Sequence, residues 1–345
     1  MKMKVFHGLV NYGTQAGFFA QELRNRGIDA LSVSSPDTFS RQVDVELLHG
    51  GNFIEKIYKH SWNWLRRVAW FIKYNTFHFY FGTTLFPNQI DLPLYKYFGK
   101  KVVMEYLGYD VQLFQYSLEK YEVTNVGKFD TKGEIKQFDA RRLKRMAHES
   151  KFINKQIVCA PYLSEFVPGA EVLPLAINLE EFPYVPKSAP EGAIKIAHAP
   201  TSRNNKGTNY IVDAVERLKS EGFDAQLLVL ENITHDALKK KYCECDIFID
   251  QVLGGWYGTA SIEAMAIGRP TICFIRESYF EYIDYGNQIP IISAQPSTLY
   301  AVLKDTIENR HFFPEIGRKS REFVENIHDV KKLTSKLIEM YKNIK

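Results

Sequence analysis

The sequence has few cysteines: only four in 345 residues, and no two of them form a Cys-x-x-Cys pair. Cys159 and Cys273 lie in apolar runs, as core residues do, and no histidine cluster accompanies Cys243 or Cys245, so no metal site is expected. No apolar run reaches the roughly 18 residues that a membrane-spanning helix needs. The first residues do not have the pattern of a signal peptide. Together these absences predict a reducing, cytoplasmic setting.

Net charge is also small. The chain carries 44 lysines and arginines against 40 acidic residues, a formal net charge of +4, so a general affinity for nucleic acid is not expected. Aromatic side chains, in contrast, are abundant at 14%, and such side chains line cores and stack on sugars and bases. The length is sufficient for two domains, each with its own core.

The order of apolar runs predicts the fold class. An apolar run at residues 5–10, a polar turn, helical spacing at residues 18–26 and an apolar run at residues 28–33 predict a β–α–β unit in a parallel sheet. A further strand of the first domain is expected at residues 101–106. The pattern restarts with a strand at residues 194–198, after a proline-bearing segment that resists helix and sheet. We therefore expect an α/β protein with two doubly wound, Rossmann-like domains facing a cleft. The expected parts are an N-terminal Rossmann-like domain at 1–175, a linker at 176–191, a second Rossmann-like domain at 192–325 and a C-terminal helix at 326–345 that could pack back on the N-terminal domain.

The most informative segment runs from Gly254 to Pro270. It follows an apolar run at residues 246–252 and contains a glycine-bearing turn and a short helix that ends at Gly268. A flexible turn that opens a helix after a parallel strand is where α/β proteins hold phosphate. Glu263, one turn into this helix, could accept hydrogen bonds from ribose hydroxyls. The segment therefore predicts a nucleotide site.

Two further turns are candidates. The loop at residues 198–208 follows the first strand of the second domain and carries Arg203 and Lys206, and two cations beside a helix N-terminus can neutralise a diphosphate without a metal. The alternative for this loop is a solvated turn with ordinary surface charges. The turn Asn11-Tyr12-Gly13-Thr14 also joins a strand to a helix, but it lacks a full Gly-x-Gly-x-x-Gly and could equally be a tight turn without a ligand.

At these residues the chain resembles the GT-B glycosyltransferases of the retaining family-4 type, also called group 1. The strongest match is Glu263-Ala264-Met265-Ala266-Ile267-Gly268-Arg269-Pro270, and supporting matches are Lys206-Gly207, the turn Gly108-Tyr109-Asp110-Val111 and the run Leu173 to Asn178. The sequence departs from the family at Gly255, where the family usually has a second glutamate eight positions before the one at Glu263. It departs again at Leu107, where a histidine often precedes the glycine.

The resemblance implies a metal-independent transferase that moves a hexose or related sugar from a nucleotide-diphosphate sugar to a hydroxyl acceptor with retention. The donor would be a UDP-sugar or a GDP-sugar, no cofactor would be bound permanently, and the acceptor would be a glycan or a lipid-linked sugar in surface glycan or polysaccharide biosynthesis. The implied donor-binding residues are Gly13, Thr14, Arg203, Lys206, Tyr257, Gly258, Thr259, Ala260 and Glu263. The implied acceptor-side residues are Asn11, Tyr12, Tyr109 and Asp110.

Arg203, Lys206 and Asp110 would act in catalysis, the two cations on the charge of the leaving diphosphate and Asp110 on an acceptor hydroxyl. The alternative for Asp110 is a cap on the segment that follows it. Two other functions share the expected architecture, a nucleotide-sugar-binding protein without catalysis and a GT-B epimerase. An epimerase would need a carboxylate or histidine pair over the sugar, and the sequence identifies none.

Residues 53–74 have helical spacing and carry both apolar residues and an excess of cations, together with Trp62, Trp64 and Trp70. One interpretation is a surface helix whose apolar face packs on the first sheet. The other is an interfacial helix that contacts anionic lipid at the inner face of the membrane, which would suit a lipid-linked acceptor.

Overall fold

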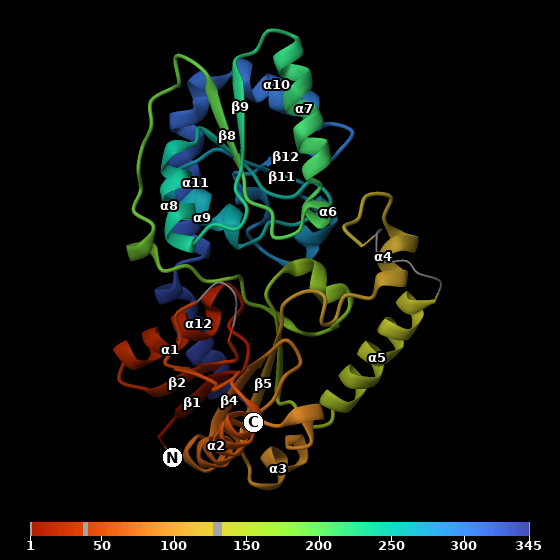
Figure 1. Ribbon diagram of the computed structural model, residues 1–345, viewed down its shortest axis with the longest axis vertical. Coiled ribbons are helices and arrows are strands. Elements are labelled where there is room, and N and C mark those ends of the chain that lie inside the picture. Colours follow the sequence, from red (N-terminus) through yellow and green to blue (C-terminus); the bar gives the residue numbers. More distant parts are fainter. Residues whose placement is uncertain (1, 37–40, 127–132, 345) are drawn as a thin grey trace. The chain divides into compact units, whose positions relative to one another are not determined.

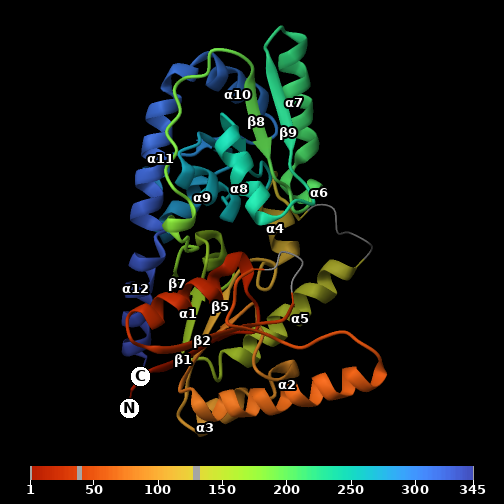
Figure 2. The ribbon, with the colours of Figure 1, turned by 60° about the vertical axis from the view of Figure 1, so that its left-hand side comes forward.

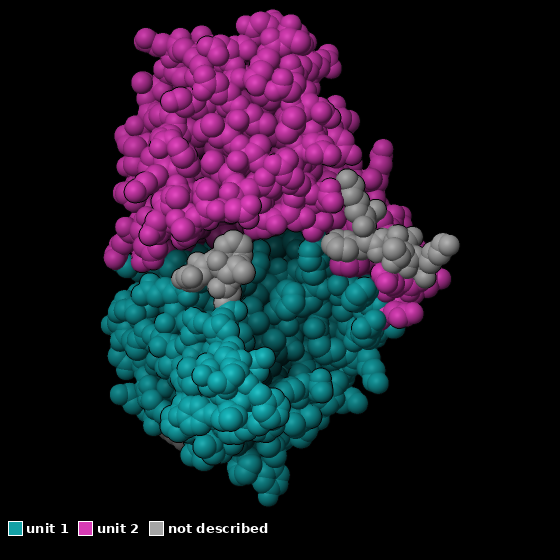
Figure 3. Space-filling model, in the orientation of Figure 1, with its two compact units in different colours: residues 1–113, 138–176, 330–345 teal, residues 114–137, 177–329 magenta. Residues whose placement is uncertain are grey.

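The computed structural model describes residues 2–36, 41–126 and 133–344, and the chain divides into two compact units (Figure 3). Unit 1 comprises residues 1–113, 138–176 and 330–345. Unit 2 comprises residues 114–137 and 177–329. The sequence placed residues 114–137 in the first domain and residues 176–191 in a linker, whereas the structure groups both with unit 2, apart from Ala176.

The sheet of unit 1 has seven strands in the described residues, in the order β3-β2-β1-β4-β5-β6-β7, and every pair is parallel (Figure 1). The strands are β1 (Lys4–Gly8), β2 (Asp29–Ser34), β3 (Val45–Glu46), β4 (Thr76–Tyr80), β5 (Lys101–Tyr106), β6 (Lys155–Val158) and β7 (Glu171–Val172). The strand order reverses between β1 and β4, which is the switch point where doubly wound sheets bind ligands.

The helices of unit 1 lie on both faces of this sheet (Figure 2). The α-helices are α1 (Gln15–Asn25), α2 (Phe53–Lys73), α3 (Leu92–Tyr97), α5 (Glu134–Glu149) and α12 (Val330–Asn343), and the short 3-10 helices are η1 (Tyr12–Thr14), η2 (Pro87–Gln89) and η3 (Pro161–Glu165). The C-terminal helix α12 belongs to unit 1, because Leu333 and Leu337 share a core cluster with Phe19 and Leu23 of α1.

A chain of buried polar side chains joins α12 to the sheet. Glu105 on β5 is 3.0 Å from Nε2 of His78, whose Nδ1 is 2.7 Å from the hydroxyl of Tyr341. That hydroxyl is 3.3 Å from Nε2 of His7, whose Nδ1 is 2.7 Å from the hydroxyl of Tyr80. Burial raises the pKa of Glu105 to about 8 and lowers the pKa values of His78, to about 3, and of His7, so it favours the neutral forms of all three groups.

The sheet of unit 2 has five strands in the described residues, all parallel, in the order β12-β11-β10-β8-β9. They are β8 (Ile194–His198), β9 (Ala225–Val229), β10 (Ile247–Ile249), β11 (Thr271–Cys273) and β12 (Ile292–Ser293). The chain passes from β8 to the edge strand β9 and returns to β10, so the switch point of this sheet lies between β8 and β10.

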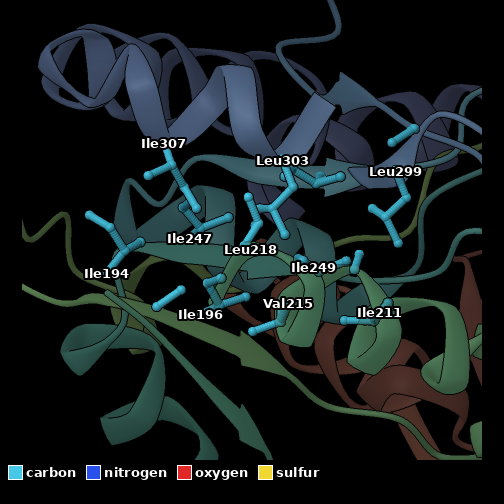
Figure 4. Close-up of a cluster of buried hydrophobic side chains, with 14 of the residues drawn as sticks. Ile194, Ile196, Ile211, Val215, Leu218, Ile247, Ile249, Leu299, Leu303 and Ile307 are labelled. Atoms are coloured by element: carbon cyan, nitrogen blue, oxygen red, sulfur yellow. The ribbon is translucent and has the colours of Figure 1, made fainter. Parts of the chain in front are cut away.

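The α-helices of unit 2 are α4 (Phe114–Lys120), α6 (Arg203–Lys206), α7 (Thr208–Ser220), α8 (His235–Glu244), α9 (Thr259–Ile267), α10 (Leu299–Glu308) and α11 (Phe313–Ile327). Its 3-10 helices are η4 (Leu179–Glu181), η5 (Glu277–Tyr282), η6 (Gly286–Gln288) and η7 (Arg310–Phe312). Ile211, Val215 and Leu218 of α7 meet Leu299 and Leu303 of α10 in a core over β8 and β10 (Figure 4).

These observations confirm the predicted fold class of two doubly wound α/β units. The strands expected at residues 101–106 and 194–198 have the predicted bounds. The segment that the sequence identified as a linker packs on unit 2. The main chain of Val185 donates to the carbonyl of Ile267, and Lys187 forms an ion pair of 2.7 Å with Asp246.

Candidate functional site

The predicted loop at residues 198–208 lies at the switch point of unit 2. It leaves β8, forms the single turn of α6 and enters α7 through Gly207, which has a left-handed φ of 77°. A Cβ atom at Gly207 would be 2.6 Å from the side chain of Val252, so only glycine allows this approach to the turn after β10. The close approach carries Lys206 over the end of β10.

There Lys206 forms an ion pair with Asp250, the residue that follows β10. The other carboxylate oxygen of Asp250 accepts from the hydroxyl of Ser261 at 2.7 Å and from the main-chain N–H of Gly258 at 3.1 Å. Burial by itself would raise the pKa of Asp250, but the ammonium of Lys206 and these hydrogen bonds outweigh it and hold the pKa below its usual value. Asp250 therefore stays ionised and holds Lys206 beside the first turn of α9.

The first turn of α9 presents main-chain donors next to Lys206. The helix begins at Thr259 with Gly258 as N-cap, and no side chain caps it. As the first N–H groups of the helix, those of Thr259 and Ala260 have no carbonyl acceptor within it, and both residues are half-buried. Because a helix N-terminus carries partial positive charge, this turn and Lys206 together form a place for an anion.

Glu263 lies one turn further along α9 and is almost buried. Its two oxygens have separate partners on α8: Nε2 of His235 at 2.9 Å and the hydroxyl of Tyr242 at 3.2 Å. The buried guanidinium of Arg269 holds the end of α8 in place, since it donates to the carbonyls of Tyr242 at 2.8 Å and Cys243 at 3.3 Å. The carboxylate is thus oriented from two sides.

Three predicted residues lie elsewhere in unit 2 or have other partners. Arg203 turns away and pairs with Glu231, at 2.9 Å from Nε to Oε1, so it does not join Lys206 at Asp250. The side chain of Tyr257 is buried, stacks on Trp256 with ring centroids 4.8 Å apart, and shares a hydrogen bond of 3.0 Å with His328. The N–H of Gly258 is taken by Asp250.

Gly255, where the sequence departs from the family that it resembles, lies against an arginine. Gly255 has a left-handed φ of 75°, and a Cβ atom there would be 2.7 Å from Nη1 of Arg276. The guanidinium of Arg276 stacks on the ring of Tyr121 at 3.7 Å and donates to the carbonyl of Val123 at 2.6 Å. These contacts also explain why residues 114–137 belong to unit 2.

In unit 1, the predicted turn after β1 lies at the switch point of that sheet. Gly13 and Thr14 both have left-handed φ values, 52° and 64°. Asn11 is buried and fixes the turn, because its side chain accepts from the N–H of Gly17 at 3.3 Å and donates to the carbonyl of Gln42 at 3.1 Å. Tyr12 is exposed.

Asp110 is buried in the other predicted turn of unit 1. Its carboxylate accepts from the N–H groups of Leu107 at 3.1 Å and Gly108 at 2.8 Å. Burial raises its pKa to about 6, although these hydrogen bonds and Arg145 oppose the rise. Asp110 therefore holds the turn that precedes it, and Tyr109 beside it is half-buried.

Sequence reasoning missed Asp250, His235 and Tyr242. Asp250 ends the apolar run before the glycine turn, and a carboxylate at the end of a central strand was a usable signal. His235 and Tyr242 carried no such signal, since α8 was not predicted. Within residues 2–36, 41–126 and 133–344, no cluster of three or more histidine, cysteine or acidic side chains suits a metal ion. The same residues include no helix both long and apolar enough to cross a membrane.

Comparison with known proteins agrees with the architecture. No family model matches the chain. Mannosylfructose-phosphate synthase of Agrobacterium fabrum is 26% identical over 108 residues, which is 31% of this chain and 24% of that enzyme. The match thus spans about a quarter of the length of that relative.

Among solved structures, sucrose-phosphate synthase from Thermosynechococcus elongatus has a TM-score of 0.63 at 14% identity and covers 99% of this chain and 98% of its own. A protein assigned as a UDP-N-acetylglucosamine 2-epimerase from Listeria monocytogenes has a TM-score of 0.56 at 11% identity, with 99% and 96% covered. The glycotransferase of kitacinnamycin has a TM-score of 0.52 at 11% identity, with 98% of each chain covered. The chain therefore has the GT-B fold. Because these neighbours include both transferases and an epimerase, the fold alone does not decide between the two activities.

Proposed function

We propose that this protein is a glycosyltransferase that moves a sugar from a nucleotide-diphosphate sugar to a hydroxyl acceptor. The observation that carries the proposal is the convergence of Lys206, the first turn of α9 and Glu263 at the switch point of unit 2. A cation, main-chain N–H groups and an oriented carboxylate are the groups that a diphosphate and a ribose need.

In this proposal the N–H groups of Thr259 and Ala260 and the ammonium of Lys206 bind the diphosphate. Glu263 accepts hydrogen bonds from the ribose hydroxyls, and His235 orients it. Arg203 would have to break its ion pair with Glu231 to reach the diphosphate. We therefore propose that Lys206 contributes more than Arg203 to stabilising the negative charge on the leaving diphosphate. Removal of one such charge-assisted contact typically lowers the rate by about 10²–10³.

We further propose that the transfer retains the anomeric configuration and needs no metal. The bond from the anomeric carbon to the diphosphate breaks with its electron pair on the phosphate oxygen. The acceptor oxygen bonds to the same face of that carbon, and the leaving phosphate takes the acceptor proton. UDP-sugars and GDP-sugars are the donors to test first.

The acceptor side is a prediction from the sequence that rests on Asn11, Tyr12, Tyr109 and Asp110, as is the donor contact of Gly13 and Thr14. Asn11 and Asp110 hold their own turns in place, which supports a positioning role for both. We propose a glycan or lipid-linked acceptor in surface glycan or polysaccharide biosynthesis, and a cytoplasmic location at the inner face of the membrane.

The test is to measure nucleotide binding by calorimetry with UDP and GDP, and then nucleotide release from a panel of nucleotide sugars with and without glycan acceptors. Glu263→Ala should weaken nucleotide binding at least roughly tenfold, because it removes a charged hydrogen-bond acceptor. Glu244→Ala, at an exposed ion pair with Lys241 on the same helix as His235, is the matched control and should change nothing.

Each alternative has a distinct outcome in this test. Nucleotide-sugar binding without release would indicate a binding protein without catalysis. A recovered nucleotide sugar with inverted configuration at one carbon, seen by NMR, would indicate an epimerase. If Glu263→Ala binds nucleotide as the unmodified chain does, the donor site is not here.

A further inference from the structure

Helix α2 turns its apolar side outward. Ile54 is 77% exposed, Leu65 is 64% exposed and Ile72 is 73% exposed. At 100° per residue these side chains lie on one side of the helix with Ile57, Tyr58 and Val68, all of them exposed. We call these six residues the α2 stripe. The expectation that the apolar face of this segment packs on the first sheet is therefore wrong.

The opposite side of α2 attaches it to unit 1. Asn63 is buried and bonds both ways with the main chain of Leu48, donating at 2.8 Å to its carbonyl and accepting at 3.3 Å from its N–H. Trp70 is buried against Phe6, with ring centroids 5.6 Å apart. These two side chains point about 180° away from the centre of the stripe, so the outward orientation is built into the fold.

The exposed surface continues onto α3. Tyr97 is 83% exposed, and the ring of its neighbour Phe98 is 5.8 Å from Phe71 on α2. Figure 2 shows α3 beside one end of the long helix α2 at the edge of unit 1. Leu65 and Val68 of the stripe also line a shallow hollow with Trp64. Contiguous apolar surface of this extent marks an interaction site.

The charge of α2 identifies the partner. The helix carries five cations and one carboxylate, an excess as large as the formal net charge of the whole chain. By helical spacing, Lys73 and Arg66 lie about 110° and 130° from the centre of the stripe on one flank of the helix. Arg67 and Lys56 lie about 130° and 150° from it on the other flank. An apolar stripe with basic residues on the flanks of the helix is complementary to the headgroup and acyl boundary of an anionic membrane. A second copy of this chain would bring like charges together.

We propose that α2, extended by Tyr97 and Phe98 of α3, lies in the interfacial plane of a membrane that contains anionic phospholipid. The helix lies on the surface and does not cross it, since its other side is bonded to unit 1. The stripe inserts among the acyl chains, and the long side chains of the flanking cations extend to the phosphates. A lipid-linked acceptor would be reached from this surface.

The test is flotation of the full chain with vesicles of phosphatidylcholine alone and of phosphatidylcholine mixed with phosphatidylglycerol. The protein should float with the mixed vesicles at least roughly tenfold more than with the neutral ones. The variant Ile54→Ser/Leu65→Ser should float with neither kind of vesicle, because it removes apolar anchors. Lys56→Glu/Lys73→Glu should lose only the preference for the mixed vesicles.

Phe312→Ser is the matched control, since Phe312 of unit 2 is an exposed aromatic outside the surface. All substituted residues are exposed, and circular dichroism checks that each variant keeps its helix content. Sedimentation of the protein without vesicles tests the rival explanation, which is self-association through the stripe. The proposal is overturned if no vesicle is bound, if the stripe variant binds as the unmodified chain does, or if the stripe instead drives self-association that the same variant abolishes. No donor or acceptor is present, so failure here leaves the proposed transferase activity standing.

Discussion

The ammonium of Lys206 is held by the buried carboxylate of Asp250, which also accepts from the N–H of Gly258 at the start of α9, so the protein itself fixes the cation beside the first turn of that helix. Asp250 itself is covered by Lys206, Ser261 and Gly258. The Lys206–Asp250 pair has no net charge, yet it presents an oriented N–H donor. Such a donor suits a ligand that is itself negatively charged, as a diphosphate is. Preorganised donors of this kind need little rearrangement during a reaction.

Replacement of Lys206 by methionine should lower nucleotide affinity and also destabilise unit 2. The substitution leaves Asp250 buried and unpaired, which costs about 3–5 kcal/mol in the free energy of unfolding. The double variant Lys206→Met/Asp250→Asn should regain most of that stability, because no buried charge remains, but not the nucleotide affinity. Urea unfolding and calorimetry with UDP separate the two effects. Recovery of affinity in the double variant would show that Lys206 does not contact the ligand.

A side chain at Gly255 should be costly because of Arg276. Gly255→Ala forces a left-handed residue, at about 1–2 kcal/mol, and displaces a guanidinium that bonds Val123. Gly222→Ala is the control, since Gly222 has a φ of 90° but no atom within 4 Å of its Cβ position. Thermal unfolding should show a larger loss for Gly255→Ala. Equal losses would mean that Arg276 moves aside freely.

Arg269→Met should destabilise α8 and weaken nucleotide binding together. It removes one donor from each of the carbonyls of Tyr242 and Cys243 and leaves that of Tyr242 with the weak thiol donor of Cys245, at roughly 1–3 kcal/mol for each lost partner. Since Tyr242 also orients Glu263, nucleotide affinity measured by calorimetry should fall as well. Arg318→Met, which breaks an exposed pair with Glu322, should cost less than about 1 kcal/mol and leave affinity unchanged.

Glu105 should make the stability of unit 1 fall as pH rises. The folded chain keeps the Glu105 proton up to about pH 8, whereas the unfolded chain releases it near its ordinary pKa of 4.5. The folded state therefore binds more protons in this window, and stability is lost on the order of 1 kcal/mol per pH unit. Glu105→Gln stays neutral and can still donate to His78, so it should flatten the dependence.

Urea unfolding from pH 5 to 8 measures this effect as the difference between Glu105→Gln and the unmodified chain. The control is Glu216→Gln, at an exposed pair with Lys219, which should follow the unmodified chain. A steeper dependence in Glu105→Gln, or a large loss of stability at neutral pH, would mean that Glu105 is ionised and paired with a charged His78.

The pattern of apolar residues along the sequence predicted the central strands of the two sheets. The strands at residues 101–106 and 194–198 are largely apolar, with the sequences KVVMEY and IKIAH, since both faces of a parallel sheet are mostly covered. The helix around Glu263 was predicted from its glycine and proline punctuation, and α9 indeed ends at Ile267 with Gly268 in a left-handed conformation. Helix α8 was missed, because its lysine-rich sequence shows little periodicity.

The sequence by itself determined the fold class, the glycine turn with its helix, and the presence of Lys206 and Glu263 in two β–α units of the second domain. Each of these depends on residues near one another in the chain. The tertiary structure alone decided which cation pairs with Asp250, that Arg203 turns to Glu231, and that the α2 stripe faces outward. These outcomes depend on partners distant in sequence, such as Leu48 for Asn63 and Phe6 for Trp70, and a helical period states which side chains share a face but not which face is covered.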